Sequence, residues 1–400
     1  MTILKKTPSK ATFLEKPLEY VHHSSADVVQ NWYKARAYVL DLICRQLDQS
    51  ESQISCWHFI VEDDSSLMLA IVRHLALYAH FTMYEERDND GNHTRLNQTV
   101  ITLVTEKKAE DIEAELRQED NLCNLPEYCK MTIFGNVQNE DSYIDIAIEV
   151  VRKTKEGNQS STHNVISITE EDVLKWCATQ DPASLLAIDT RKALYVNAIY
   201  NLGGSIDNLK YEDINNTKRY AKALDVYQYR VLKDSLFNGD GKYKKLINEK
   251  WKNNYNAVRD GISNIICADC LEIREKEVII KVASETKNGK APKDAWQKYI
   301  VELSQCEHNR WVVEKLISGF HPLDKKEIFK YERLFGNQRK MYLAGLKKRL
   351  DHPCHIDICP NEDMRRLDPD NMKYDSFLML AVPLILKEIR EENKRFRIKP

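Results

Sequence analysis

LSQCEHNRWVVEKLISGF, residues 303–320, is the stretch from which the rest of the chain is best interpreted. At 3.6 residues per turn, one stripe is apolar, and it holds Leu303, Cys306, Val313 and Ile317. The neighbouring stripe places Trp311 between Glu307 and Glu314, and Arg310 lies within reach of both acids. His308 adds a group that titrates near neutrality. The pattern predicts a helix that ends at Gly319 and carries charges beside an aromatic ring.

These residues carry a family resemblance. Residues 306–320 resemble the Glu-x-x-Arg-Trp…Glu-Lys…Gly-aromatic core of the RyR domain, a repeat first described in ryanodine receptors and found singly in many bacterial proteins. A second set looks like the other half of that domain, namely His352-Pro353, Asp363-Met364, Lys373-Tyr374-Asp375 and Ala381-Val382-Pro383. The resemblance covers residues 291–400 and implies a helical RyR-like domain there. It extends weakly back to about residue 185.

Composition predicts a globular and mainly helical chain. With 400 residues, 42% hydrophobic and 30% charged, the chain is long enough for two or three domains. The formal net charge of −2 gives no overall electrostatic attraction to nucleic acid, so a nucleic-acid partner is not expected, although a local basic patch is left open.

The sequence contains no segment that predicts membrane insertion or secretion. No apolar run approaches the roughly 18–20 residues of a membrane helix, and the first residues lack the apolar core of a signal peptide. The ten cysteines are scattered, which favours buried thiols in a reduced compartment over disulfides. We expect a cytoplasmic protein.

Residues 51–155 predict a small parallel α/β unit. Apolar β-type runs lie at 55–61, 100–106 and 130–136, and they alternate with helical patterns at 67–81 and 107–120. A further helix is predicted at 26–47, after an irregular arm. The strand-helix alternation indicates a Rossmann-like sheet, and bacterial RyR-domain proteins often resemble a fusion of a TrkA-type Rossmann domain with the RyR module.

The turn after Val61 lacks the glycines with which a Rossmann turn binds a pyrophosphate. Its sequence is Glu62-Asp63-Asp64-Ser65-Ser66, so three carboxylates stand where a phosphate would bind, and like charges repel. We therefore expect a degenerate domain that serves as a scaffold or in oligomerisation. A solvated acidic loop is favoured here over a Mg²⁺ site.

The remaining chain is predicted to be helical. After a polar linker at 154–165, helical patterns occupy 170–179, 182–200, 211–236 and 262–269, and a later one at 325–350 is broken at Gly336. An irregular loop is expected at 351–364, followed by a helix at 378–389 that Pro383 kinks or bounds. The predicted organisation is an arm and helix (1–50), the degenerate Rossmann-like domain (51–155), a helical connecting region (166–290) and the RyR-like domain (291–400).

The spacing of Cys267 and Cys270 suits zinc, and two ligands from Cys354, His355 and Cys359 could complete a tetrahedral site. Because the first pair lies in an apolar helical segment, buried thiols are favoured, and no metal or cofactor is assigned. The sequence contains neither a Gly-x-Ser-x-Gly motif nor a P-loop motif.

One group of residues has the chemistry of a ligand site, and it comprises Glu307, His308, Arg310, Trp311, Glu314 and Lys315 with Lys373, Tyr374 and Asp375. Trp311 can stack on a planar ligand, Arg310 can bind an anionic oxygen, and the carboxylates can accept hydrogen bonds. The alternative is that Glu307, Arg310 and Glu314 form an ion network and that Trp311 caps the core.

The function expected is that of a non-enzymatic bacterial signalling or regulatory protein that binds a small nucleotide-derived effector through its RyR-like domain and forms homo-oligomers. The family setting implies antiviral defence as one context. Two alternatives are open: a metal-dependent enzyme that acts on nucleotides or nucleic acid through Glu62, Asp63 and Asp64, and a structural assembly or interaction protein.

Overall fold

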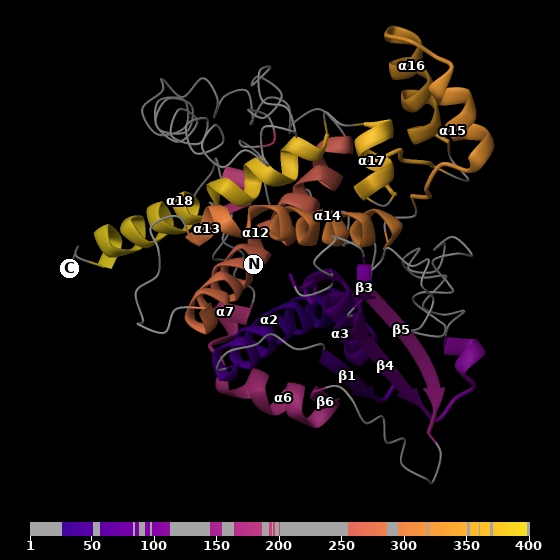
Figure 1. Ribbon diagram of the computed structural model, residues 1–400. Helices are drawn as coiled ribbons and strands as arrows, with labels where there is room; N and C mark the ends of the chain where they lie inside the picture. Colours follow the sequence, from indigo (N-terminus) through magenta and orange to yellow (C-terminus); the bar gives the residue numbers. More distant parts are fainter. Residues whose placement is uncertain are drawn as a thin grey trace.

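A computed structural model describes sixteen stretches of the chain (Figure 1). They are residues 26–50, 57–82, 85–87, 93–96, 98–112, 145–153, 164–185, 192–193, 195–196, 200, 255–285, 295–317, 320–349, 353–359, 361–368 and 371–397. The predicted arm, the strand at 130–136, the helix at 211–236 and the cap at Gly319 lie outside the described residues.

Four parallel strands form the central sheet. They are β1 (Trp57–Glu62), β4 (Thr99–Thr105), β5 (Ile146–Arg152) and β6 (Asn164–Thr169), in the spatial order β5-β4-β1-β6. A separate antiparallel pair consists of β2 (Glu85–Arg87) and β3 (His93–Leu96). β1 and β4 are the two inner strands, and their apolar side chains are largely buried, as continuous apolar runs predict for a covered parallel sheet. The parallel α/β unit is confirmed.

The strand β6 departs from the prediction of a linker at 154–165. It begins at Asn164 and pairs with β1 along its whole length, so the sheet continues beyond residue 155. In its sequence NVISIT, Ile166 and Ile168 share one face, as suits an edge strand with one covered face. Ile168 is fully buried, whereas Val165, on the opposite face, is 47% exposed. The polar residues that precede the strand concealed this short pattern.

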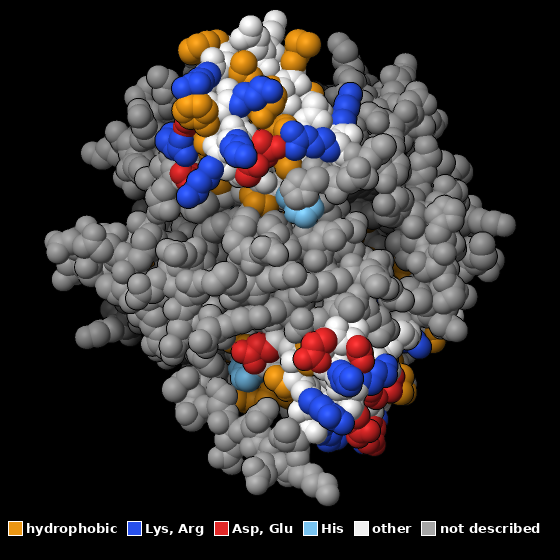
Figure 2. All heavy atoms as spheres, turned by 90° about the vertical axis from the view of Figure 1, so that its right-hand side faces the viewer, with side chains coloured by type: hydrophobic (Ala, Val, Ile, Leu, Met, Phe, Trp, Pro, Cys, Tyr) orange, Lys and Arg blue, Asp and Glu red, His pale blue; other side chains and the backbone are white. Residues whose placement is uncertain are grey.

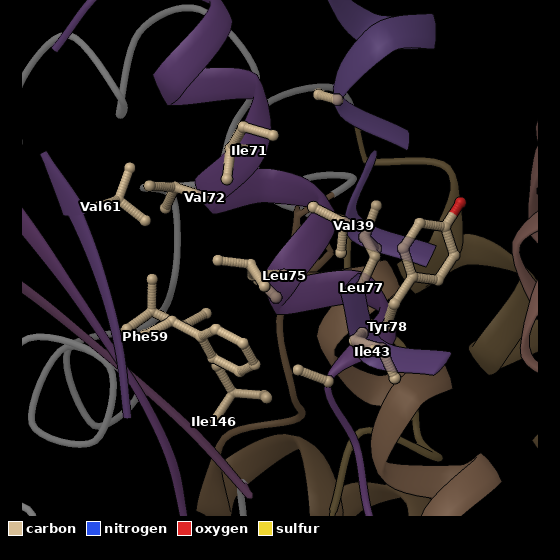
Figure 3. Close-up of a cluster of buried hydrophobic side chains, with 14 of the residues drawn as sticks. Val39, Ile43, Phe59, Val61, Ile71, Val72, Leu75, Leu77, Tyr78 and Ile146 are labelled. Atoms are coloured by element: carbon tan, nitrogen blue, oxygen red, sulfur yellow. The ribbon is translucent and has the colours of Figure 1, made fainter. Parts of the chain in front are cut away.

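One helix, α3 (Ser66–Tyr78), covers a face of the sheet, and a second, α2 (Ala26–Gln49), packs on α3. The predicted N-terminal helix is confirmed as α2, and α3 follows β1. Figure 3 shows Val72 and Leu75 of α3 directed toward the strands, with Val39 of α2 behind them. After β6, a capping box between Thr169 and Asp172 starts α6 (Glu170–Thr179), and α7 (Pro182–Leu185) follows.

The helical part is built around two long helices, α12 (Tyr255–Glu285) and α18 (Met372–Arg397), with α14 (Ile300–Ile317) packed against both. Shorter helices complete it: α13 (Ala295–Lys298), α15 (Lys325–Glu332), α16 (Asn337–Lys347) and α17 (Asn361–Leu367). One hydrophobic cluster runs from the sheet through α3 to Val313 and Leu316 of α14. The sheet and α14 therefore share a core, and the division into domains stays a prediction.

Buried polar contacts also join the two parts. Arg36 of α2 pairs with Asp269 of α12, and the Tyr78 hydroxyl of α3 donates to the same carboxylate at 3.0 Å. Arg274 of α12 donates to the carbonyl oxygen of His80 at 2.6 Å. Because these partners come from elements far apart in sequence, their hydrogen bonds fix the orientation of α12 against α2 and α3.

Three helix boundaries in the C-terminal part test the predictions. The break at Gly336 is confirmed, since this residue has φ of 50° and separates α15 from α16. Part of the predicted loop at 351–364 is instead helical, because α17 begins at Asn361. Pro383 does not bound a helix: α18 continues through it, and its buried apolar neighbours offset the missing N–H.

No helix among the described residues is long and apolar enough to cross a membrane.

Candidate functional site

α14 lies at the centre of the helical part (Figure 1), and the structure buries twelve of its eighteen residues. Five of the six candidate residues on this helix are among them. Glu307 and Arg310 are fully buried, and His308, Glu314 and Lys315 are at most 5% exposed. Trp311 alone of the six is only partly buried. The predicted helix is confirmed, but most of its polar side chains face the interior.

Arg310 is enclosed by two carboxylates from its own helix. Its Nε and Nη2 donate to Glu307 Oε1 and Oε2 at 2.7–3.0 Å, and its Nη1 donates to Glu314 Oε2 at 2.8 Å. Lys315 Nζ donates to Glu314 Oε1 at 2.8 Å, and the Ser263 hydroxyl of α12 donates to Glu314 Oε2 at 2.7 Å. The spacing of three and four residues that the sequence shows is thus realised as a buried ion network.

Two positive and two negative groups balance one another in this network. Burial alone raises the pKa of Glu314, but Lys315 and Arg310 outweigh it and lower that pKa to about 2. Burial opposes the charge of Arg310 too, yet Glu307 and Glu314 raise its pKa well above the ordinary value. Glu314 and Arg310 are therefore both charged at neutral pH. The arrangement matches the interpretation of these residues as an ion network, with the Arg310 donors directed inward.

Trp311 lies at the edge of this network and contacts three basic side chains. Its ring stacks on His308, with centroids 6.2 Å apart and planes 18° apart. Lys315 Nζ lies 5.4 Å from the ring centroid, and the His355 ring meets Trp311 edge-on at 4.9 Å. Trp311 also packs against the main hydrophobic cluster. It therefore caps the core, and part of its surface stays accessible.

The candidates on α18 are brought to the same helix. His308 Nδ1 lies 3.5 Å from Asp375 Oδ2, and His308 Nε2 lies 3.3 Å from the carbonyl oxygen of Cys359. Burial opposes a charge on either member of the pair, but the contact between them raises the pKa of His308, and burial raises that of Asp375. The Tyr374 ring lies 6.3 Å from that of Tyr200. The side chain of Lys373 lies outside the described residues.

Residues 353–359 supply two residues that the sequence did not place in the Trp311 site, although it named one of them, His355, as a possible zinc ligand. The His355 ring contacts both Trp311 and Phe320, and the Asp357 carboxylate lies 3.6 Å from His355 Nδ1. Asn371 donates to Asp357 Oδ2 at 2.9 Å, whereas Asp357 Oδ1 is buried with no hydrogen-bond partner among the described residues. Burial and the neighbouring Asp368 raise the pKa of Asp357 to about 6. No residue spacing signals this group, because loop and helix meet only in the folded chain.

The acidic turn after β1 is arranged differently. Glu62 accepts a hydrogen bond from the Ser167 hydroxyl at 2.8 Å, and Asp64 accepts one from Thr105 at 2.6 Å and pairs with Lys107 at 3.2 Å. Asp63 is exposed with φ of 85°. The three carboxylates thus point to different partners and do not converge on one point.

The described part of the chain contains no group of three or more His, Cys, Asp or Glu side chains placed to hold a metal ion. Cys267 and Cys270 lie on α12, each about 1% exposed, and Cys267 packs in a different hydrophobic cluster from Cys354 and Cys359. The five residues of the zinc hypothesis are therefore not assembled into one site.

The chain shows no significant match to any family model, curated protein or solved structure. The RyR-like and Rossmann-like resemblances accordingly stay predictions, and function is argued from the site alone.

Proposed function

We propose that this chain is a non-enzymatic bacterial regulatory protein that binds a small nucleotide-derived effector at the edge of α14, in the RyR-like region 291–400. The observation that carries the proposal is the position of Trp311. An accessible aromatic surface lies next to His355, and His355 in turn adjoins a buried carboxylate oxygen without a hydrogen-bond partner. The antiviral context that the resemblance implies is part of this proposal.

The site suits a planar ligand with hydrogen-bond donors. A nucleobase presents a flat ring that can stack on the accessible part of Trp311. Its amino or imino groups can donate to the Asp357 oxygen, and a buried acceptor that gains such a donor recovers the free energy lost on desolvation. Arg310 does not enter this recognition, because its donors are held by Glu307 and Glu314. In this proposal the ion network holds α14 in place and Trp311 makes the contact.

The same proposal assigns the sheet to a degenerate Rossmann-like unit that acts as a scaffold and in homo-oligomerisation. Counted along the chain, its strands have the order 3-2-1-4, which also begins a doubly wound fold. A ligand of such a fold binds outside the carboxyl ends of the strands where the order reverses, here between β1 and β6. At that point Ser65 caps α3 and donates to Glu170 at 2.9 Å. These two side chains therefore take up the place at the N-terminus of α3 where such a fold would bind an anion.

The test is binding by the full chain with Trp311→Ala and a matched control. Trp176→Ala removes another partly buried tryptophan, one that contacts Tyr38 on the far side of the core. Native mass spectrometry of the purified protein, before and after exposure to a nucleotide-rich extract, reports both bound mass and oligomeric state. A nucleotide-range mass retained by wild type and Trp176→Ala but lost in folded Trp311→Ala is expected.

A second variant separates stacking from hydrogen bonding at the site. Asp357→Asn keeps the shape of the side chain but replaces one acceptor oxygen by a donor, so affinity for a nucleobase donor should fall about tenfold or more. Circular dichroism checks that each variant is folded. Retention of the same mass by folded Trp311→Ala and Asp357→Asn would contradict the proposal.

A further inference from the structure

The helical hairpin formed by α15 and α16, residues 324–349, is chemically unlike the rest of the chain. It contains nine Lys and Arg residues against three Asp and Glu residues, a net charge of +6 in a chain whose formal total is −2. The remaining residues therefore sum to −8. A local positive field of this kind attracts polyanions even though the whole protein does not.

The hairpin also exposes large apolar side chains. Phe329 is 54% exposed, Phe335 is 74% exposed and Met341 is 76% exposed, and they are among the seven most exposed large hydrophobic side chains of the described residues. In Figure 1 α15 and α16 project from the body, and Figure 2 shows Lys and Arg side chains interspersed with hydrophobic ones on that side. Apolar side chains presented to water beside cations mark a surface for a partner.

The hairpin is held to the rest of the chain by packing and hydrogen bonds. A capping box between Asp324 and Glu327 starts α15, and the Tyr331 hydroxyl donates to the carbonyl oxygen of Leu367 at 3.0 Å. A small hydrophobic cluster that includes Leu346 and Ile356 fixes the hairpin to the loop 353–359. The Arg333 guanidinium lies 3.5 Å from the centre of the Phe329 ring, so a cation is stacked directly on an exposed aromatic.

Several cations of the hairpin are available for an external partner. Glu327 and Glu332 are already paired, with Arg349 and Arg366. Lys325, Lys326, Lys340 and Lys348 are exposed and form no ion pair within the described part of the chain. Lys325 and Lys326 precede Phe329 in α15, Lys340 precedes Met341 in α16, and Lys348 follows α16.

We propose that the α15–α16 hairpin binds single-stranded nucleic acid, with phosphates at its lysines and bases stacked on its exposed phenylalanines. This ligand class combines regularly spaced negative charges with flat apolar faces, and proteins bind it through basic surfaces interleaved with aromatic rings. A helix that binds a membrane surface gathers its apolar residues on one face, with cations at the rim of that face. On the hairpin, apolar residues and cations are instead interspersed. The proposal is independent of the Trp311 site and uses none of its residues.

The experiment measures fluorescence anisotropy of labelled oligothymidylate and oligouridylate of about 16 nucleotides with the full chain. Wild type should bind both strands, and binding should weaken between about 50 and about 200 mM salt. A duplex of the same length should bind more weakly, because its bases are stacked on one another and unavailable to Phe335.

Charge reversals with a matched control locate the surface. Lys326→Glu with Lys340→Glu should lower affinity about tenfold or more and reduce the logarithmic salt slope by about 1.4, about 0.7 for each lost phosphate contact. Both positions lie in first helical turns, where glutamate is compatible with the helix. Lys387→Glu with Lys394→Glu makes the same charge change on exposed positions of α18 and should leave affinity within about twofold.

Replacement of one ring separates base stacking from charge attraction. Phe335→Leu keeps an apolar side chain but removes the flat aromatic face, so affinity should fall about fivefold or more. Three results would overturn the proposal: no binding by wild type, equal loss in the α18 control, or binding to anionic lipid vesicles that is tighter than binding to the oligonucleotides and unchanged in Phe335→Leu.

Discussion

Two neighbouring segments, α14 and the α15–α16 hairpin, use the same residue types with opposite consequences. In α14 the charges of Glu307, Arg310 and Glu314 are buried, and each is matched by a partner. In the hairpin, Arg333 and several lysines are exposed, and water already stabilises them. Because an unpaired charge is costly only where water is excluded, the first set holds the fold together, whereas the second can be used for binding.

One substitution applied to both segments tests this contrast, and its larger effect is expected in α14. Arg310→Met removes a buried cation and leaves the buried carboxylates of Glu307 and Glu314 with only Lys315 to balance them, so the free energy of unfolding should fall by about 3–5 kcal/mol. Urea denaturation followed by circular dichroism measures the loss. Replacing Glu307 and Arg310 together by apolar residues should recover much of it, because Glu314 keeps its partner Lys315 and no unpaired charge is left. A decrease below about 1 kcal/mol for Arg310→Met, the range of exposed pairs, would contradict a structural network.

A smaller effect, dependent on pH, is expected at Asp357, where one buried carboxylate oxygen, Oδ1, has no hydrogen-bond partner among the described residues. The unfolded carboxyl has its ordinary pKa near 3.8 and the folded one about 6, so the folded state binds more protons between these values. Stability should therefore decrease as pH rises through this window, by roughly 2–3 kcal/mol in total, with no contribution below it and the full cost above it. Asp357→Asn should remove this slope and be more stable than wild type at pH 7.

Unfolding curves of wild type and Asp357→Asn are compared at several pH values. This comparison separates Asp357 from Glu314, whose shift acts in both proteins, whereas the part of the His308 shift that Asp357 causes is lost together with it. If the two proteins differ equally at all pH values, Asp357 has no raised pKa. A site that costs stability in the absence of ligand fits a binding role better than a purely structural one.

The contrast also shows what the sequence could and could not predict. The spacing of Glu307, Arg310 and Glu314 was enough to predict their pairing, because helix geometry alone places such residues together. Spacing did not decide which side of α14 would be buried, since both stripes carry suitable residues. The pair of Trp311 with His355 and the isolated oxygen of Asp357 depend on a loop that reaches α14 from elsewhere in the chain, and no local pattern contains that information.

The same limit applied to the sheet. Apolar runs predicted β1 and β4, which are inner strands, whereas β6 was missed because an edge strand needs only alternate apolar residues. That the acidic turn at Glu62 is unsuited to a phosphate, on charge grounds, stays a prediction. Its actual use, in hydrogen bonds to Ser167 and Thr105, required the strand order to be known.

The smallest effect is expected from the same change of Arg to Met on the hairpin. Arg333 is exposed, and its described contact is the stacking of its guanidinium on Phe329 at 3.5 Å, so Arg333→Met should lower the free energy of unfolding by only about 0.5–1 kcal/mol. The urea experiment used for Arg310→Met measures it under identical conditions. Increasing salt should leave the Arg333→Met difference nearly unchanged, because the carboxylates nearest in the hairpin are already paired with Arg349 and Arg366. A loss as large as that of Arg310→Met would mean that the hairpin cations support the fold, and the contrast between the two segments would then fail.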